Sequence, residues 1–330
     1  MNGNTMTNIS CTAALLALAL SAPALAQDAQ FTNIVRLTNR EVALRFMAPA
    51  GAHYRIDTST NLSGATNDRW SSMVILQSLG VNQHTDAAAP FASARFYRAE
   101  QLTGSNILTG DNLTTTNGDI VFHPVNHASF VMSWNGKWIY NDPVGGAAPY
   151  AAFPRADLIL VSHSHSDHYS ASTLSALRAT NGLIIVPQAV YNQGDFAALR
   201  PYSQVLAYNA STNVIGVNVL AVAGYNGNHA FGINNCYVTT IGGKRIFTSG
   251  DTGDTPEIRA LTNIDVAFVC MNLPFTLNWI AATNMIRAMR PKVVYPFHYR
   301  DSGNTYTNPP LFKQMLGTDP GVEVRLRNWY

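Results

Sequence analysis

Charged residues are scarce in this chain, and no basic run is present. Asp, Glu, Lys and Arg make up 12% of the 330 residues, and the formal net charge is only +2. Proteins that bind nucleic acid or an anionic membrane surface usually carry a basic stripe, so neither partner is indicated. The hydrophobic fraction of 47% instead predicts a globular protein with a substantial core, and the length suggests about two domains.

The sequence also lacks an apolar run long enough to span a bilayer, so no integral membrane segment is predicted. The run at 11–20 is short, and Ala24-Leu25-Ala26 before Gln27 has the small-x-small pattern of a signal-peptide cleavage site. We expect residues 1–26 to be a signal peptide cleaved after Ala26, and the mature protein to be secreted or periplasmic. Because no Lys or Arg precedes the apolar run, a disordered start is the alternative.

Cysteine is rare, and cleavage at that site would leave only Cys236 and Cys270. They lie in predicted strands at 235–241 and 265–270, and a third predicted strand covers 245–249. If this third strand lies between the other two, the cysteines are two strand spacings apart, about 9–10 Å. That separation exceeds the reach of a disulfide. We therefore predict two free, buried cysteines.

Residues 27–101 have a pattern of their own. Short alternating segments are separated by Pro, Gly, Asn and Ser clusters, which predicts a small all-β sandwich domain. His53 and His84 fall here without ligand spacing, and we interpret both as surface or loop residues. A stabilising or spacing role is the first interpretation of this domain, and binding of a glycan, a surface or a partner is the alternative. The predicted strands are 34–37, 42–46, 53–57, 72–76 and 96–99.

From residue 102 to 330, strand-like and helix-like segments alternate. Such interleaving predicts a layered α/β fold. Pro291 sets the end of the last long helical pattern. The predicted strands are 119–123, 128–134, 137–140, 157–161 and 322–326, and the predicted helices are 171–179, 188–199, 277–290 and 310–316.

The most informative motif is the run from His163 to His168, which reads His-Ser-His-Ser-Asp-His and follows the apolar strand at 157–161. Side chains of a strand alternate with period two, so His163 and His165 share one face. Asp167 and His168 follow as the chain turns. Four metal-binding side chains at the carboxyl end of a strand are what a two-metal hydrolytic site requires.

Two further candidate ligands each follow an apolar run. Asp251 comes after the strand at 245–249, and His298 comes after 293–296. In open α/β sheets, ligands bind at the carboxyl ends of strands. We therefore expect both side chains beside the histidine motif.

Taken together, these residues resemble the metallo-β-lactamase superfamily of hydrolases over about residues 107–330. The branch that the motifs resemble contains the L-ascorbate-6-phosphate lactonase-like and N-acylphosphatidylethanolamine phospholipase D-like enzymes. The resemblance implies an αββα sandwich with the site at one edge between the two sheets. The motifs that carry it are His127-Ala128-Ser129, Asp142-Pro143, the run His163 to His168, Gly250-Asp251-Thr252 and Pro296-Phe297-His298-Tyr299.

The resemblance also implies a set of ligands for two divalent metal ions. His229 completes it, as the only histidine in the sequence between His168 and His298. The residues after His229 depart from the family's usual Pro-Lys-Gly. Imidazole and carboxylate ligands suit zinc first, with manganese or iron as alternatives. Metal one would take His163, His165 and His229, metal two would take Asp167, His168 and His298, and Asp251 would bridge them.

The chemistry implied is hydrolysis of a small-molecule substrate. Two cations would lower the pKa of a shared water from 15.7 to about 7, and the resulting hydroxide would attack a lactone, an ester or a phosphodiester. No Gly-x-Ser-x-Gly elbow is present, so a serine nucleophile is not expected. The candidate catalytic residues are Asp167, Asp251 and His127.

Several alternatives stay open from the sequence. His127 could contact substrate or donate a proton, or it could be a structural strand residue. Asp142 could orient a ligand histidine, or it could belong to an Asp-Pro turn. The whole protein could instead be a low-activity metal-binding or surface-binding scaffold, or a β-lactam hydrolase. The sequence indicates no oligomeric state.

Overall fold

The computed structural model describes residues 29–62, 70–300, 305–317 and 321–330. The signal peptide predicted at 1–26 lies outside the described residues. Among the helices within them, none combines the length and apolar character needed to cross a membrane.

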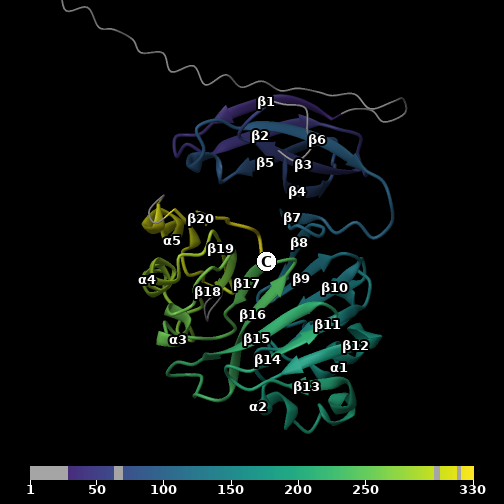
Figure 1. Cartoon of the computed structure of the whole chain (residues 1–330), viewed down its shortest axis with the longest axis vertical. Coiled ribbons are helices and arrows are strands. Elements are labelled where there is room, and N and C mark those ends of the chain that lie inside the picture. The colour runs from purple at the N-terminus through teal and green to yellow at the C-terminus, as the bar shows by residue number, and fades with distance from the viewer. Residues whose placement is uncertain (1–28, 63–69, 301–304, 318–320) are drawn as a thin grey trace, which may run out of the picture.

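Two large sheets enclose the main core (Figure 1). Phe130 and Met132 of β9 pack into the core shared with the seven-stranded sheet, whereas Val131 packs in a second cluster. This split follows from the period-two alternation of a strand. The seven-stranded sheet has the order β14-β15-β16-β17-β18-β19-β20. Its strands are β14 Ser211–Val214, β15 Val217–Gly224, β16 Asn234–Ile241, β17 Lys244–Thr248, β18 Val266–Cys270, β19 Val293–Phe297 and β20 Glu323–Val324.

The other large sheet has ten strands in the order β13-β12-β11-β10-β9-β8-β7-β4-β3-β6. Leu158 and Leu160 of β11 face the main core, and Ile159 packs in the second cluster. The strands of this sheet from residue 110 onward are β7 Gly110–Leu113, β8 Ile120–Asn126, β9 Ser129–Trp134, β10 Lys137–Asn141, β11 Ala156–Leu160, β12 Arg178–Val186 and β13 Ser203–Val205.

Helices cover the outer faces of both sheets. Leu174, Leu177 and Val190 of α1 and α2 pack in the second cluster, against the ten-stranded sheet. Helices α3 to α5 lie beside the seven-stranded sheet (Figure 1). The layers therefore run α-β-β-α, which confirms the predicted fold class. The helices are α1 Ala171–Leu177, α2 Gln188–Tyr191, α3 Pro256–Arg259, α4 Trp279–Met289 and α5 Pro309–Leu316.

The N-terminal strands form the all-β region that the sequence predicts. Leu44 and Phe46 of one sheet pack against Tyr54 and Ile56 of the other. One sheet has the order β1-β2-β5, and β4, β3 and β6 extend the ten-stranded sheet through pairing of β4 with β7. A domain boundary at residue 101 stays a prediction, because this sheet runs across it. The strands are β1 Gln30–Arg36, β2 Val42–Met47, β3 His53–Ser59, β4 Ser71–Gln77, β5 Val81–Asp86 and β6 Phe96–Leu102.

Three predicted elements are wrong in extent. The helix expected at 188–199 is the short α2, followed by a loop and a 3-10 turn at Ala197–Tyr202. In this stretch the aromatic ring of Phe196 is completely buried, so tertiary packing overrides the helical pattern. The helix expected at 171–179 ends at Leu177, and the chain enters the unpredicted strand β12. The last strand is only Glu323–Val324.

The cysteine prediction is confirmed, and the interpretation of His84 as a surface or loop residue is wrong. Cys236 and Cys270 are free and buried on β16 and β18, with β17 between them. His84 lies on β5 and lines a cavity of about 170 Å³ together with Asp111 and Trp329. Burial lowers the pKa of His84 to about 4. His53 lies at the start of β3 and is partly exposed, as expected of a surface residue.

Candidate metal centre

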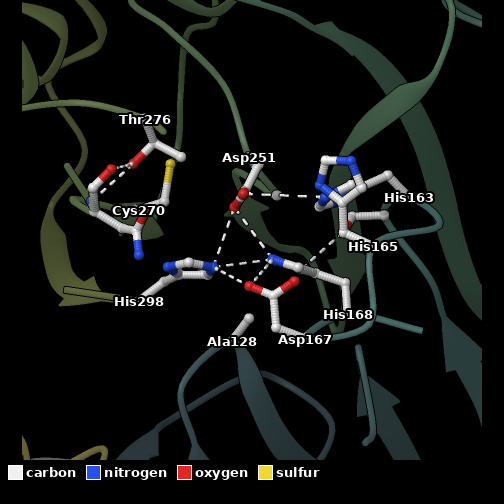
Figure 2. Close-up of polar contacts among 12 residues, drawn as sticks. Ala128, His163, His165, Asp167, His168, Asp251, Cys270, Thr276 and His298 are labelled. Carbon is white, nitrogen blue, oxygen red and sulfur yellow. Dashed lines mark hydrogen bonds and ion pairs between the residues drawn. The ribbon is translucent and has the colours of Figure 1, made fainter. Parts of the chain in front are cut away.

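The candidate ligands lie where strands of the two sheets end. The run His163 to His168 follows β11, Asp251 follows β17, and His298 follows β19. Strands β10 and β11 are parallel, as are β17, β18 and β19. Because parallel strands end at the same edge of a sheet, their loops converge. In Figure 2, imidazole and carboxylate side chains from these loops point toward one another.

One group consists of His163, His165, His229 and Asp251, whose ligand atoms all lie within 4.8 Å of one another. His229 Nε2 is 3.2 Å from His165 Nδ1 and 3.4 Å from Asp251 Oδ2. His163 Nε2 is 3.9 Å from the same carboxylate oxygen. These are the residues that the family resemblance implies for metal one, with the bridging aspartate.

A second group lies on the other side of Asp251. His168 Nε2 and His298 Nε2 are 2.9 Å apart, and they lie 3.2 and 3.3 Å from Asp251 Oδ1. Asp167 Oδ2 is 3.3 Å from His298 Nε2. Asp251 therefore offers one carboxylate oxygen to each group, as a bridging ligand does. The structure brings all the residues named for metal two together.

The donor atoms of both groups suit cations. His163 Nε2 and Asp251 Oδ1 are shielded from solvent, and neither has a hydrogen-bond partner among the described residues. Buried polar atoms normally have partners, and a missing partner points to an ion or a water. Imidazole nitrogens and carboxylate oxygens that converge in this way could hold metal ions.

Two candidate ligand histidines have an acceptor behind the ring. Asp142 Oδ2 lies 2.8 Å from His168 Nδ1, the contact that the orienting hypothesis for Asp142 requires. Asn226 Oδ1 lies 3.1 Å from His229 Nδ1 and accepts from the His229 amide at 2.9 Å. A proton on Nδ1 leaves the Nε2 lone pair free for a metal. The role of Asn226 was not predicted, although the Tyr225-Asn226 step before His229 was the available signal.

The backbone is strained at three of these loop positions. His127, Asp142 and His298 have positive φ angles of 56°, 41° and 49°. Residues other than glycine rarely adopt this region, and such strain clusters at functional sites. At Gly250, with φ of 53°, an added Cβ would lie 2.8 Å from Ser162 Cβ, so only glycine fits before Asp251. The strained backbone at these positions therefore costs conformational energy and directs the site side chains toward the centre.

The electrostatics of the site favour ionised carboxylates. Burial disfavours the charged form of Asp251, but His298 and His168 outweigh this effect and hold the Asp251 pKa well below its ordinary value. Burial is likewise outweighed at Asp167 by hydrogen bonds from His127 and His298, so its pKa is also lowered. Burial lowers the pKa of His163 and so favours the neutral form that binds metals.

His127 lies beside the second group. Its Nε2 is 3.3 Å from Asp167 Oδ2, and its ring centroid is 3.7 Å from that of His298. Its Nδ1 is 2.7 Å from the hydroxyl of Tyr330, a contact between residues far apart in the sequence that was not predicted. The structure thus places His127 at the site, where it is more than an isolated strand residue.

The surroundings of the centre differ in character from side to side. Ser164, Ser166 and Tyr169 line a groove of about 1070 Å³ that is rich in hydroxyl groups. On the loops near His229 and after β18, Phe231 and Phe275 are exposed by 65% and 43%. In this groove the Tyr169 hydroxyl donates a hydrogen bond to Asp195 Oδ1 at 2.6 Å.

The protein-family comparison and the curated relatives agree with this geometry. The β-lactamase superfamily domain matches residues 122–298. A UPF0173 metal-dependent hydrolase from Pelotomaculum thermopropionicum is 28% identical over 217 residues, which cover 61% of this chain and 93% of that protein. A UPF0173 metal-dependent hydrolase from Thermococcus kodakarensis is 30% identical over 222 residues, which cover 61% of this chain and 96% of that protein.

Solved structures show the same fold. A metal-dependent hydrolase from Parabacteroides distasonis has a TM-score of 0.58 at 30% identity, covering 67% of this chain and 99% of that chain. The diiron β-hydroxylase CmlA from Streptomyces venezuelae, at 14% identity and a TM-score of 0.52, covers 87% of this chain and 68% of that chain, and shows similarity of fold alone. Because the family match spans more than half of the sequence, the chain belongs to the metallo-β-lactamase superfamily, where its relatives are metal-dependent hydrolases.

Proposed function

We propose that this protein is an exported, binuclear metal-dependent hydrolase that cleaves a lactone, an ester or a phosphodiester in a small-molecule substrate. The observation that carries the proposal is the convergence of two ligand groups on the two carboxylate oxygens of Asp251. Two divalent cations held there, zinc first, would lower the pKa of a shared water from about 15.7 to about 7 and so supply the nucleophile. Export rests on the predicted signal peptide.

Burial indicates the side from which substrate approaches. The side chains of His163, His168 and His298 are at most 1% exposed and form the floor of the centre. The Asp167 side chain is 44% exposed, and His165 also reaches the surface. Substrate therefore enters over Asp167 and His165. A catalytic group that acts on it must lie at this open rim, as His127 does beside Asp167.

The flanking surfaces support a substrate with a polar part. Ser164 and Ser166 line the large groove, and their hydroxyl groups suit a hydroxylated or phosphorylated group. The exposed Phe231 and Phe275 suit an apolar group on the other side. Asn228 Nδ2 donates to the Pro274 carbonyl at 3.0 Å and ties the two loops that carry these rings. A lactone or ester with one polar and one apolar part fits this division.

The proposal is tested by hydrolysis measurements on the zinc-loaded chain. The panel contains a lactone, a p-nitrophenyl ester, bis-p-nitrophenyl phosphate and a cephalosporin. We expect turnover of the lactone, the ester or the phosphodiester, lost on chelation and restored by zinc. Asp251→Asn should lower kcat/KM by more than about 100-fold, because loss of an outer-shell partner alone typically costs up to about that factor.

Asp254→Asn is the matched control. Asp254 lies three residues after Asp251, pairs with Arg259 at 3.1 Å and belongs to neither ligand group. It should retain activity. Turnover of the cephalosporin alone would replace the proposal with a β-lactam hydrolase. Bound zinc without turnover of any of the four compounds would favour the scaffold reading.

A further inference from the structure

His127 is held from both sides of its ring. The Tyr330 hydroxyl is 2.7 Å from Nδ1, and the Asp167 carboxylate is 3.3 Å from Nε2. The Tyr330 hydroxyl also accepts a hydrogen bond from the backbone amide of Arg300 at 3.0 Å. The main chain of His127 is fixed as well, since its amide donates to the Trp329 carbonyl at 3.0 Å. This set of contacts leaves the ring one orientation.

One placement of the protons gives every donor and acceptor of this set a partner. An ionised carboxylate only accepts hydrogen bonds, so the proton between His127 and Asp167 belongs to His127 Nε2. A neutral imidazole then presents Nδ1 as an acceptor. The Tyr330 hydroxyl already accepts from Arg300, and its own proton points to this nitrogen. The Arg300 amide, the Tyr330 hydroxyl, the His127 ring and the Asp167 carboxylate then each have a hydrogen-bond partner.

We infer that Tyr330 is a positioning residue that keeps His127 in the Nε2–H form, so that His127 donates a hydrogen bond at the open rim of the centre and does not bind metal. This inference rests on the proposed function for its chemical use. At the open rim, a substrate oxygen can share the long hydrogen bond that this Nε2–H group makes to Asp167, and the developing negative charge is then stabilised as water attacks. Tyr330 touches only His127 and the Arg300 amide in this set, so it acts through His127.

A rival interpretation is present in the same geometry. His127, Asp167 and His298 offer ligand atoms within 4.8 Å of one another, so His127 could itself bind a metal through Nε2. In that case His127 Nδ1 would carry the proton and donate a hydrogen bond to the Tyr330 hydroxyl oxygen. The two interpretations assign opposite tautomers to His127, and they differ in the effect of its removal on metal content.

The surroundings of Tyr330 allow its hydroxyl to be removed without disturbing its ring. The Arg300 guanidinium lies 4.0 Å from the ring centroid of Tyr330. The rings of Tyr299 and Tyr306 lie 5.1 and 5.7 Å from it. Phenylalanine would keep these contacts. Tyr306→Phe is the matched control, because it removes a hydroxyl from the same cluster without a contact to His127.

The test combines kinetics with a measurement that needs no substrate. On the zinc-loaded chain, Tyr330→Phe should lower kcat about tenfold for whichever panel compound is hydrolysed, with KM changed by less than about twofold. His127→Asn, whose side chain tolerates the positive φ, should lower kcat further and keep the full zinc content. The double variant should match His127→Asn, since Tyr330 acts through His127. Tyr306→Phe should behave as the wild type.

Nitrogen NMR of the histidine rings in the zinc-loaded wild type should show His127 protonated at Nε2 and unprotonated at Nδ1. The inference is overturned by the opposite tautomer, by a zinc ion lost in His127→Asn, by additive effects in the double variant, or by wild-type kcat in Tyr330→Phe. If no panel compound is hydrolysed, the proposed function fails, while the tautomer and the zinc content still decide the role of Tyr330.

Discussion

Replacing Asp142 with asparagine should weaken metal binding while leaving the fold in place. The Asp142 carboxylate is buried and accepts three hydrogen bonds: Oδ1 from the Ser162 amide at 2.7 Å, and Oδ2 from the Ser162 hydroxyl at 2.7 Å and from His168 Nδ1 at 2.8 Å. An amide of the same shape has only one acceptor oxygen. If that oxygen keeps the Ser162 amide, its NH₂ group faces His168 Nδ1.

Two donors then oppose each other, and His168 loses the contact that keeps its proton on Nδ1. The tautomer with the proton on Nε2 becomes competitive, and this proton occupies the position of the metal. Loss of such an outer-shell partner typically lowers metal affinity by about 10–100-fold. That range corresponds to about 1.4–2.7 kcal/mol of binding free energy. We expect the loss at the site that contains His168 and Asp167, with the His163 site unchanged.

The assay is a zinc titration in competition with a chromophoric chelator, accompanied by chemical denaturation of the metal-free protein. Asp157→Asn is the matched control, because Asp157 Oδ2 accepts a backbone hydrogen bond from Trp138 at 2.8 Å and touches no ligand histidine. The control should bind both zinc ions as the wild type does. Wild-type affinity at both sites in Asp142→Asn would refute the orienting role of Asp142.

Three further predictions concern other parts of the chain. Because burial lowers the pKa of His84 to about 4 from an ordinary 6.5, the unfolded chain binds this proton more readily, and stability falls as pH drops from about 6.5 toward 4. Chemical denaturation between pH 7.5 and 5 should show a loss about 2 kcal/mol larger in the wild type than in His84→Gln, and parallel curves would contradict this. Burial raises the pKa of Cys270 to about 11 and that of Cys236 as well. The native mature chain should therefore resist a thiol reagent and show both thiols only when unfolded, whereas rapid labelling of the native chain would be the opposite result. The mature protein exported from a Gram-negative host should begin at Gln27 by mass spectrometry, and an intact leader would argue against export.

The candidate centre was predicted from local sequence patterns, namely apolar runs and the residues that follow them. The apolar run that becomes β11 is buried on both faces, with Leu158 and Leu160 in the main core and Ile159 in the second cluster, and its end fixes where the histidine motif emerges. Asp251 and His298 were found by the same reasoning, because each follows an apolar strand. The separation of Cys236 and Cys270 also followed from strand order. These inferences depend on strand ends and spacing, which a single sequence shows directly.

Other features depend on contacts that a single sequence does not show. Tyr330 meets His127 across 203 residues, and no local pattern marks the pair. β5 contains His84 in a segment with little apolar content, so its place in a sheet is set by pairing with β2. The apolar run near the end of β12 is too short to distinguish a strand from a helix. Its strand form is decided by parallel pairing with β11.

The measurement that tests the central claim most directly is the number of metal ions per chain. Native mass spectrometry of the zinc-reconstituted protein should show two zinc ions, and Asp251→Asn should bind fewer, because Asp251 faces both ligand groups. Hydrolysis of a panel compound should rise with the second zinc ion. A wild-type chain that binds no more than one zinc ion at saturation, or that hydrolyses the compound fully without metal, would contradict a binuclear centre.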